Sequence, residues 1–177
     1  MFEGCNALSD IQSLGKWKIS TKNLDNTSNS KNYSLQNDFS YMFSDCWSLS
    51  NIQPLENWNV SNINYFSFMF SSCKSLSDIK PLEKWKVSNA HVFEGMFRDC
   101  TSLSDINPLE KWNVSNCNYF DSMFYGCISL TSIKSLEKWD VSKGKNFENM
   151  FYGCSKLSDF KPLKKWKISK SLLKKIK

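Results

Sequence analysis

Cysteine is the residue type whose spacing most invites a chemical interpretation here. Six of the seven cysteines recur at a nearly constant interval: Cys5, Cys46, Cys73, Cys100, Cys127 and Cys154. A zinc site usually needs closer pairs such as C-x2-C, and the sequence has none. A disulfide needs Cα atoms within about 7 Å, whereas neighbouring helices pack about 8–10 Å apart. We therefore expect a row of buried, reduced thiols and no metal or other cofactor.

The other candidates for catalysis lack partners. His91 is the one histidine, and six serines each follow a valine or isoleucine, so these serines cannot each have a histidine base. Cys117 lies outside the row of cysteines, and we expect an exposed free thiol with no base beside it. The sequence therefore predicts that the chain is not an enzyme. An enzyme of unrecognised type would need a pocket of ionisable groups with strongly shifted pKa values.

The cysteines are one column of a 27-residue repeat. Met-Phe dipeptides begin at residues 42, 69, 96, 123 and 150, and a sixth, at residue 1, is displaced by 14 further residues. Leucine, isoleucine, tryptophan and valine columns keep the same step. Repeats of this length are typical of chains that bury a core by stacking one unit on the next. We expect the tryptophan column in that core, with Trp47, which lies outside it, as a candidate surface contact.

Each repeat changes its hydrophobic period midway. Phe93, Met96, Phe97, Cys100 and Leu103 have the spacing of one face of an α-helix. Proline follows in the next segment, and the stretch Trp112-Asn113-Val114 then alternates inward and outward as a short strand does. The pattern therefore predicts one helix over the Met-Phe segment and one strand over the Trp-x-Val segment.

Stacking these units predicts an α/β fold. We expect a leucine-rich-repeat-like right-handed solenoid, with a short parallel β-sheet on the concave face and helices on the convex face. Residues 1–177 would form a single repeat domain of about six repeats. A polar 14-residue insertion at 21–34 would form a surface loop. Residues 170–177 would form a C-terminal cap with a basic tail, although a membrane-surface anchor is the alternative.

The repeat resembles the BspA-like leucine-rich repeats, whose unit carries a W-x-V-S-N stretch and then an M-F-x-x-C helix. One copy here reads Leu76-x-x-Ile79-x-x-Leu82-x-x-Trp85-x-Val87-Ser88-Asn89, followed by Phe93-x-x-Met96-Phe97-x-x-Cys100. The resemblance extends over essentially the whole chain. It implies adhesion or protein binding without a catalytic motif, since the family includes bacterial surface proteins and proteins of protists and their large viruses. The signal peptide and anchor expected of a surface protein are missing, so a fragment and a short intracellular member both remain open.

The residues flanking each tryptophan should point outward on the concave face. They predict a lysine-rich binding surface composed of Lys16, Lys18, Lys84, Lys86, Lys111, Asn113, Lys138, Asp140, Lys165 and Lys167. The partner would be an acidic protein, a glycan or a nucleic acid, although a solvated face without a partner is also open. A column of glutamates at residues 56, 83, 110 and 137 directly precedes this surface and can neutralise much of it.

The net charge of +6 is unevenly distributed. Residues 161–177 contain eight lysines and no acid, so residues 1–160 carry 6 − 8 = −2. The average charge therefore does not indicate nucleic-acid binding, and no exposed aromatic series accompanies the lysines.

The sequence as a whole favours a non-catalytic protein–protein interaction scaffold that binds through the lysine-rich concave face. The alternatives are a cell-surface adhesin fragment that binds host or matrix proteins and, last, a nucleic-acid-binding module. We expect a protein partner, no transmembrane segment, and homo-oligomers formed through open solenoid ends. A cytoplasmic location is favoured over the cell surface, because reduced thiols suit a reducing compartment and the N-terminus lacks a signal peptide.

Overall fold

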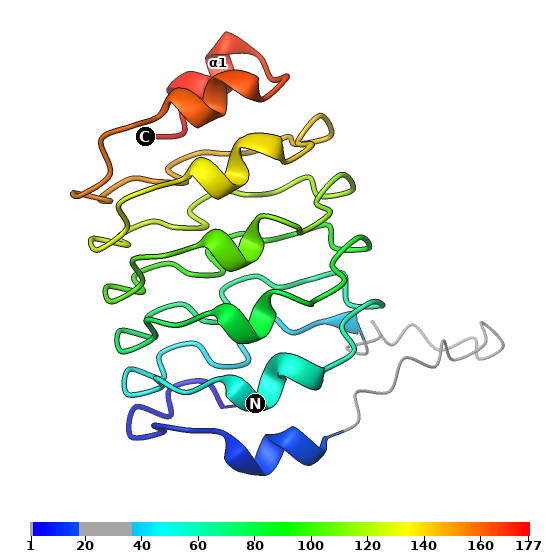
Figure 1. The fold of residues 1–177 in the computed structure, drawn as a ribbon, viewed down its shortest axis with the longest axis vertical. Coiled ribbons are helices and arrows are strands. Elements are labelled where there is room, and N and C mark those ends of the chain that lie inside the picture. The colour runs from blue at the N-terminus through cyan, green and yellow to red at the C-terminus, as the bar shows by residue number, and fades with distance from the viewer. Residues whose placement is uncertain (1, 18–36) are drawn as a thin grey trace, which may run out of the picture.

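The computed structural model describes residues 2–17 and 37–177. Figure 1 shows the repeats stacked as successive layers, and most layers contribute one short helix to the same face. These are 3₁₀-helices: η1 (Gln12–Lys16), η3 (Gln53–Asn57), η4 (Lys80–Leu82), η5 (Asn107–Leu109), η6 (Lys134–Lys138) and η7 (Lys161–Lys165). Within the described residues there is one α-helix, α1 (Lys170–Lys174), which lies at the C-terminal end of the stack. The predicted loop at 21–34 lies outside the described residues, and the single-domain organisation stays a prediction.

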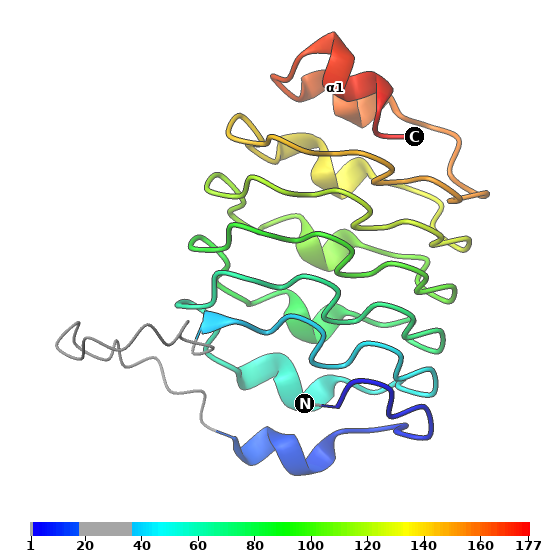
Figure 2. The ribbon, with the colours of Figure 1, turned by 180° about the vertical axis from the view of Figure 1, so that it is seen from behind.

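Proline starts most of these 3₁₀-helices. It occupies the first or second helical position in η3, η4, η5 and η7, where the missing N–H would have no partner in any case. The leucine of each helix then points inward, and Leu55, Leu82 and Leu109 are fully buried. We call the surface that carries η1 and η3–η7 the helix face. Figure 2 shows the opposite side of the stack, where irregular backbone runs in front of the helices.

The Met-Phe segments do not form the predicted α-helices. In the segment 91–100, alternate N–H groups donate to the next layer: Phe93 N to Tyr119 O, Gly95 N to Asp121 O and Phe97 N to Met123 O, each at 2.9 Å. The N–H groups between them close turns within the layer, as Met96 N does on Phe93 O at 3.2 Å. The helix prediction is wrong because these segments divide their hydrogen bonds between neighbouring layers and local turns. We call them the turn segments: 37–46, 64–73, 91–100, 118–127 and 145–154.

Left-handed residues explain why the turn segments form neither a helix nor a strand. Two columns, four residues apart, have positive φ in successive layers: Tyr41, Phe68, Gly95, Ser122 and Asn149 in one, and Asp45, Ser72, Asp99, Gly126 and Gly153 in the other. L-residues reach this region at a cost of roughly 1–2 kcal/mol, which favours glycine, asparagine and aspartate there. Helices and strands need negative φ at every residue. A residue with positive φ therefore turns the backbone, and regular structure cannot extend beyond a few residues.

The predicted parallel sheet is absent from the described part of the chain, which has no strand. The parallel pairing there is limited to isolated bridges, such as Tyr65 with Val92 and Val92 with Tyr119. Trp112 and Val114 are both buried, as the alternation predicted, but their link to the preceding layer is a side-chain bond from Trp112 Nε1 to Leu82 O at 3.0 Å. The expected α/β solenoid with a concave sheet and convex helices is therefore wrong.

Aromatic columns fill the core between layers. Phe43, Phe70, Phe97 and Phe124 are fully buried, and neighbouring rings in this column stack at centroid distances of 5.6–5.8 Å. The tryptophans also lie in the core, and in each layer from Trp58 to Trp166 the indole Nε1 donates to the leucine carbonyl of the layer before, at 2.9–3.2 Å. The predicted burial of this column is thus confirmed from Trp58 onward, whereas Trp17 is 42% exposed.

The predicted row of buried, free thiols is confirmed from Cys46 to Cys154, whereas Cys5 is exposed. Each buried Sγ donates to the phenylalanine carbonyl of the preceding layer at 3.0–3.2 Å, as Cys100 does to Phe70 O. The exposed thiol predicted at Cys117 is wrong. Cys117 is fully buried and donates to His91 O at 3.3 Å, and burial raises the pKa of its thiol to about 12. Its column holds Ile63, Ala90 and Gly144, so the position selects small or apolar side chains.

Gly95 tests the requirement for left-handed residues. Its φ is +57°, and an added Cβ would lie 2.3 Å from Cε1 of Phe68. Gly95→Ala should therefore lower the free energy of unfolding by about 2–3 kcal/mol, from backbone strain and overpacking together. Urea denaturation followed by tryptophan fluorescence measures the loss.

Gly153→Ala is the matched control for this variant. The φ of Gly153 is +76°, but its added Cβ would come no nearer than 3.4 Å to another atom. This variant should lose only about 1 kcal/mol. Equal losses for the two variants would contradict the proposed clash with Phe68.

Candidate functional site

Side chains just before each 3₁₀-helix fix the orientation of the helix face. The Oδ1 atom of Asp78 accepts from Lys80 N at 2.7 Å, and that of Asp105 accepts from Asn107 N at 2.9 Å. Asn51, Ser132 and Asp159 do the same in their layers. Short oxygen-bearing side chains are suited to this bond because they reach an N–H two residues onward. The exposed residues of each helix are thus presented in the same way in every layer.

Lysines of the helix face pair with glutamates of the preceding layer. Lys84 Nζ lies 2.8 Å from Glu56 Oε1, Lys111 Nζ lies 3.5 Å from Glu83 Oε1, and Lys138 Nζ lies 3.3 Å from Glu110 Oε1. The three lysine side chains are 74–79% exposed. Ion pairs this exposed contribute little to stability, but they set the charge of the face: positive and negative groups alternate along it.

The pKa values of these groups reflect the pairing. The hydrogen bond from Lys84 holds the pKa of the Glu56 carboxyl below its ordinary value, and the same bond raises the pKa of Lys84. A hydrogen bond from Lys134 likewise lowers the pKa of Glu137. The charged forms of Glu56 and Glu137 are therefore favoured, and they offset the lysines beside them.

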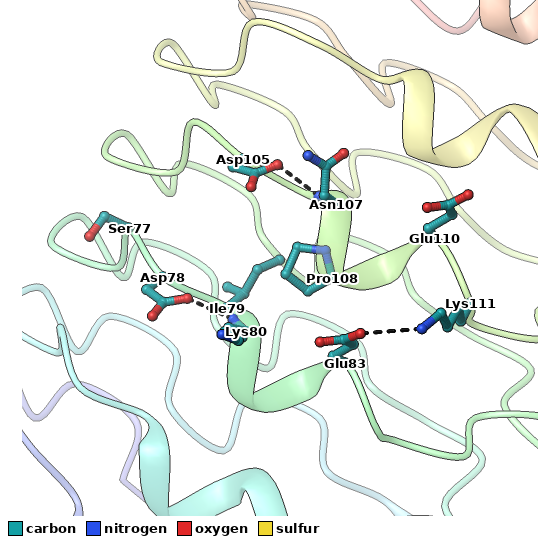
Figure 3. Close-up of a pocket in the computed structure, with 10 residues that line it drawn as sticks. All are labelled: Ser77, Asp78, Ile79, Lys80, Glu83, Asp105, Asn107, Pro108, Glu110 and Lys111. Atoms are coloured by element: carbon teal, nitrogen blue, oxygen red, sulfur yellow. Dashed lines mark hydrogen bonds and ion pairs between the residues drawn. The ribbon is translucent and has the colours of Figure 1, made fainter.

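A groove of about 490 Å³ lies between η4 and η5. Figure 3 shows the Glu83–Lys111 ion pair at one end, the Asp78 and Asp105 carboxylates at the other, and Pro108 between them. Lys80 and Asn107 also line it. A second groove, of about 310 Å³, lies between η3 and η4, with Gln53, Lys84 and Pro81 among its lining residues. Both grooves follow from the spacing of neighbouring 3₁₀-helices.

The described residues of the predicted lysine-rich surface are all exposed. Lys16, Lys138 and Lys165 lie within 3₁₀-helices, and Lys84 and Lys111 lie two residues beyond the ends of η4 and η5. The second column, which follows the tryptophans, contains Lys86, Asn113, Asp140 and Lys167, whereas Lys18 lies outside the described residues. In this column, the Oδ1 atoms of Asn113 and Asp140 accept from the N–H groups of Ser115 and Ser142 at 3.2 and 3.1 Å. The lysines lie on or beside the helix face and not on a concave sheet.

The sequence interpretation missed exposed aromatic side chains on the turn segments. Tyr41, Tyr65 and Tyr119 are 40–46% exposed, and Tyr152 is 54% exposed. Tyr41 stacks on Phe68 with ring centroids 5.1 Å apart. These residues fall outside the repeat columns of large apolar residues, and that irregularity was the available signal. Trp47, a candidate contact in the sequence, is 44% exposed, and Lys74 Nζ lies 4.1 Å above its ring.

The described ranges contain no group of three or more His, Cys, Asp or Glu side chains placed to hold a metal ion. None of the helices within 2–17 and 37–177 has both the length and the apolar character that a membrane span requires.

The layered arrangement can be compared with known proteins. The family model described as "Mycoplasma protein of unknown function, DUF285" matches residues 1–105 and, separately, residues 77–175. The chain belongs to the DUF285 family. The two overlapping matches span nearly all of this DUF285 chain, as expected if its repeats align with the model in more than one register. The match agrees with a repeat family related to the one inferred from the sequence, while BspA-like membership stays a prediction.

Two solved structures are similar to this DUF285 chain. One is a leucine-rich cell surface protein from Faecalibacterium prausnitzii A2-165, with 18% identity and a TM-score of 0.48. The alignment covers 78% of the DUF285 chain and 31% of that protein, so the chain spans about a third of its length. The other is an internalin from Listeria monocytogenes, with 13% identity and a TM-score of 0.20, covering 91% of this chain and 64% of that one. No curated protein matches the chain.

Proposed function

We propose that this DUF285 protein is a non-catalytic scaffold that binds a protein partner through its helix face. The observation that supports the proposal is the groove between η4 and η5, which an exposed ion pair closes at one end. Its volume of about 490 Å³ is within the range of ligand-binding clefts and suits a few side chains of a partner polypeptide.

The charges of the helix face refine the kind of partner. Glu56, Glu83 and Glu110 hold three of the predicted lysines in ion pairs. A partner with only acidic groups would therefore meet glutamates beside each lysine. We expect instead a partner with both signs of charge, arranged to complement the alternation, because such patterns fix register and reject wrong partners.

The layered core supports the scaffold role. From residue 37 onward, the phenylalanine, tryptophan and cysteine columns are buried and joined from layer to layer. Exposed side chains on such a base lose little further backbone freedom when a partner binds, which favours affinity. Variation between layers in the exposed positions, such as Lys80, Asn107 and Lys134, would then supply specificity.

A photo-crosslinking residue at Asn107 tests this function, with one at Glu148 on a turn segment as the control. Asn107 lines the groove, whereas Glu148 is exposed away from it. Bait protein is offered to lysate of the source cell and, separately, to extracellular proteins. We expect one protein to crosslink from Asn107 and not from Glu148. Equal crosslinking from both positions would contradict the helix face as the binding surface.

The double variant Glu83→Lys/Lys111→Glu separates recognition from folding. It keeps an ion pair across the groove and the same net charge, but it inverts the charge order that the partner meets. We expect an unchanged unfolding midpoint and at least about a tenfold loss of affinity for the crosslinked partner. The loss arises because the inversion brings like charges face to face across the interface. Retained affinity in this variant would move the site elsewhere, for example to the exposed tyrosines. Binding only to extracellular proteins would favour the adhesin alternative.

A further inference from the structure

The C-terminal end of the stack carries a charge that the other layers do not. Eight lysines lie within residues 161–177 without a single acidic residue, and all eight are exposed. They belong to η7, to α1 and to the residues around them, which lie together at this end of the stack (Figure 1). This basic end, residues 161–177, is separate from the groove and the paired lysines of the helix face.

A change in one repeat column leaves these lysines unpaired. The column that supplies Glu56, Glu83, Glu110 and Glu137 to inner layers supplies Lys164 in the last one. Among the residues that the structure describes, none of the eight lysines forms an ion pair. Asp159 Oδ1 accepts from Lys161 N at 2.9 Å. Hydrogen bonds from Lys134 and Ser142 lower the pKa values of Glu137 and Asp140, and attraction to Lys165 and Lys167 adds to this lowering, so these two acids offset part of the charge. The eight lysines outnumber these acids, and the basic end keeps an excess of positive charge.

The backbone that carries these lysines is fixed to the rest of the stack. Ser169 caps α1 by accepting from Leu172 N at 3.3 Å, and the side chain of Ile176 is fully buried. Beyond α1 the backbone joins the last turn segment: Asn149 N donates to Lys175 O at 2.7 Å and Phe151 N to Ile176 O at 2.9 Å. The apolar residues of α1, Leu172 and Leu173, pack against the core. They are consequently not free to insert into another apolar phase.

We propose that the basic end binds the surface of an anionic phospholipid bilayer. Lysine ammonium groups act as point charges toward phosphate and carboxylate headgroups, and clusters of four to eight are typical of binding to anionic membranes. A bilayer is a planar array of charge, so it can meet lysines presented by two different elements without a matching shape. Because Leu172 and Leu173 of α1 already pack, partly buried, against the core, the attraction is electrostatic and reversible by salt.

The residues of the basic end favour a bilayer over nucleic acid. The segment contains no arginine, which is the usual reader of guanine edges. The aromatic residue within the segment, Trp166, is buried, and Phe160, directly before the segment, is half-buried and covered by Lys177 Nζ at 3.9 Å. Neither ring offers a stacking platform to a base. What remains is a set of unpaired cations on a rigid base.

Vesicle sedimentation with the full chain tests the proposal. The vesicles are phosphatidylcholine with or without about 30% phosphatidylserine, a charge density at which each nearby lysine adds attraction. We expect binding only to the anionic vesicles, and at least about a tenfold loss when salt rises from about 0.05 M to about 0.5 M, because the screening length shortens severalfold. Equal binding to neutral vesicles, or to anionic vesicles at both salt concentrations, would overturn the proposal.

Two triple variants with the same change in net charge locate the binding surface. Lys164→Glu/Lys165→Glu/Lys167→Glu changes the basic end, and Lys84→Glu/Lys86→Glu/Lys111→Glu changes the helix face. We expect a loss of at least about tenfold for the first and less than about threefold for the second. If charge reversal unfolds the first variant, the Gln triple at the same positions replaces it. Equal losses for both variants, or binding to duplex DNA without binding to vesicles, would overturn the proposal. The proposal for the groove between η4 and η5 is unaffected by either result.

Discussion

Raising the pH from about 9 to about 10 is expected to lower the free energy of unfolding by about 4 kcal/mol. Burial raises the pKa values of four thiols in the middle of the stack, namely Cys73, Cys100, Cys117 and Cys127. The same thiols ionise at their ordinary value, near 9, once the chain unfolds. The unfolded thiols are already about half ionised at pH 9, so each contributes about 1 kcal/mol over this pH unit, below the limit of about 1.4, and these four together give about 4 kcal/mol.

The direction of this effect follows from the folded pKa being the higher one. The stabilisation by protonated thiols is complete below the unfolded pKa and is lost as the pH rises toward the folded pKa. The thiol protons also form hydrogen bonds between layers: Cys100 Sγ donates to Phe70 O and Cys127 Sγ donates to Phe97 O, both at 3.1 Å. A thiolate would lose that donor and face a carbonyl oxygen.

Urea denaturation at several pH values between about 8 and about 10, with a reductant present, measures the slope. Cys100→Ala is the control, because it removes one thiol and leaves every lysine and tyrosine that also titrates there. The slope of its free energy of unfolding against pH should be smaller than that of the wild type by the contribution of about one proton. An unchanged slope would mean that the thiols are not the groups responsible.

Replacing Phe97 by alanine should lower the free energy of unfolding by about 3–5 kcal/mol. The Phe97 side chain is fully buried and stacks on Phe70 at 5.8 Å on one side and on Phe124 at 5.7 Å on the other. Truncation opens a cavity in the middle of the stack, where the layers on both sides are held by the same aromatic column. The loss therefore includes both transfer and cavity contributions.

Chemical denaturation monitored by tryptophan fluorescence and by circular dichroism measures this effect. Tyr152→Ala is the matched control, since Tyr152 is 54% exposed and stacks on Tyr125 alone among the described residues. Its loss should be below about 1 kcal/mol. Because each layer contacts only its neighbours, the Phe97→Ala variant should also unfold less cooperatively, with transitions that differ between the two probes. A Phe97→Ala loss as small as that of Tyr152→Ala would contradict the role of the column.

The sequence predicted which residues are buried better than it predicted the backbone that buries them. Phe93, Met96, Phe97 and Cys100 point inward as expected. Their spacing fits an α-helix, but it fits successive turns equally well when residues at two fixed positions adopt positive φ. Glycine, asparagine and aspartate at those positions, such as Gly95 and Asp99, were the available signal. Tyr41 and Phe68 in the same column obscured it.

The candidate site shows a similar division. The exposure of Lys84 and Lys111 follows from their places beside buried tryptophans, and it was predicted. Their charge partners could not be identified from the sequence, because the neighbour in the chain is not the neighbour in space. Lys84 follows Glu83 directly yet pairs with Glu56, 28 residues earlier. The distance between layers decides this pairing, and that distance depends on the turn segments, which the sequence analysis predicted as helices.

The constant offset of the tryptophan bonds has a consequence for how genes of this kind can change length. From Trp85 to Trp166, each indole donates to a carbonyl 30 residues earlier, and only Trp58, across the insertion, reaches back 44. Duplicating or deleting one whole repeat would leave every other donor opposite an equivalent acceptor. Unequal recombination between repeats should thus yield foldable alleles of different lengths, whereas a deletion of part of a repeat should not.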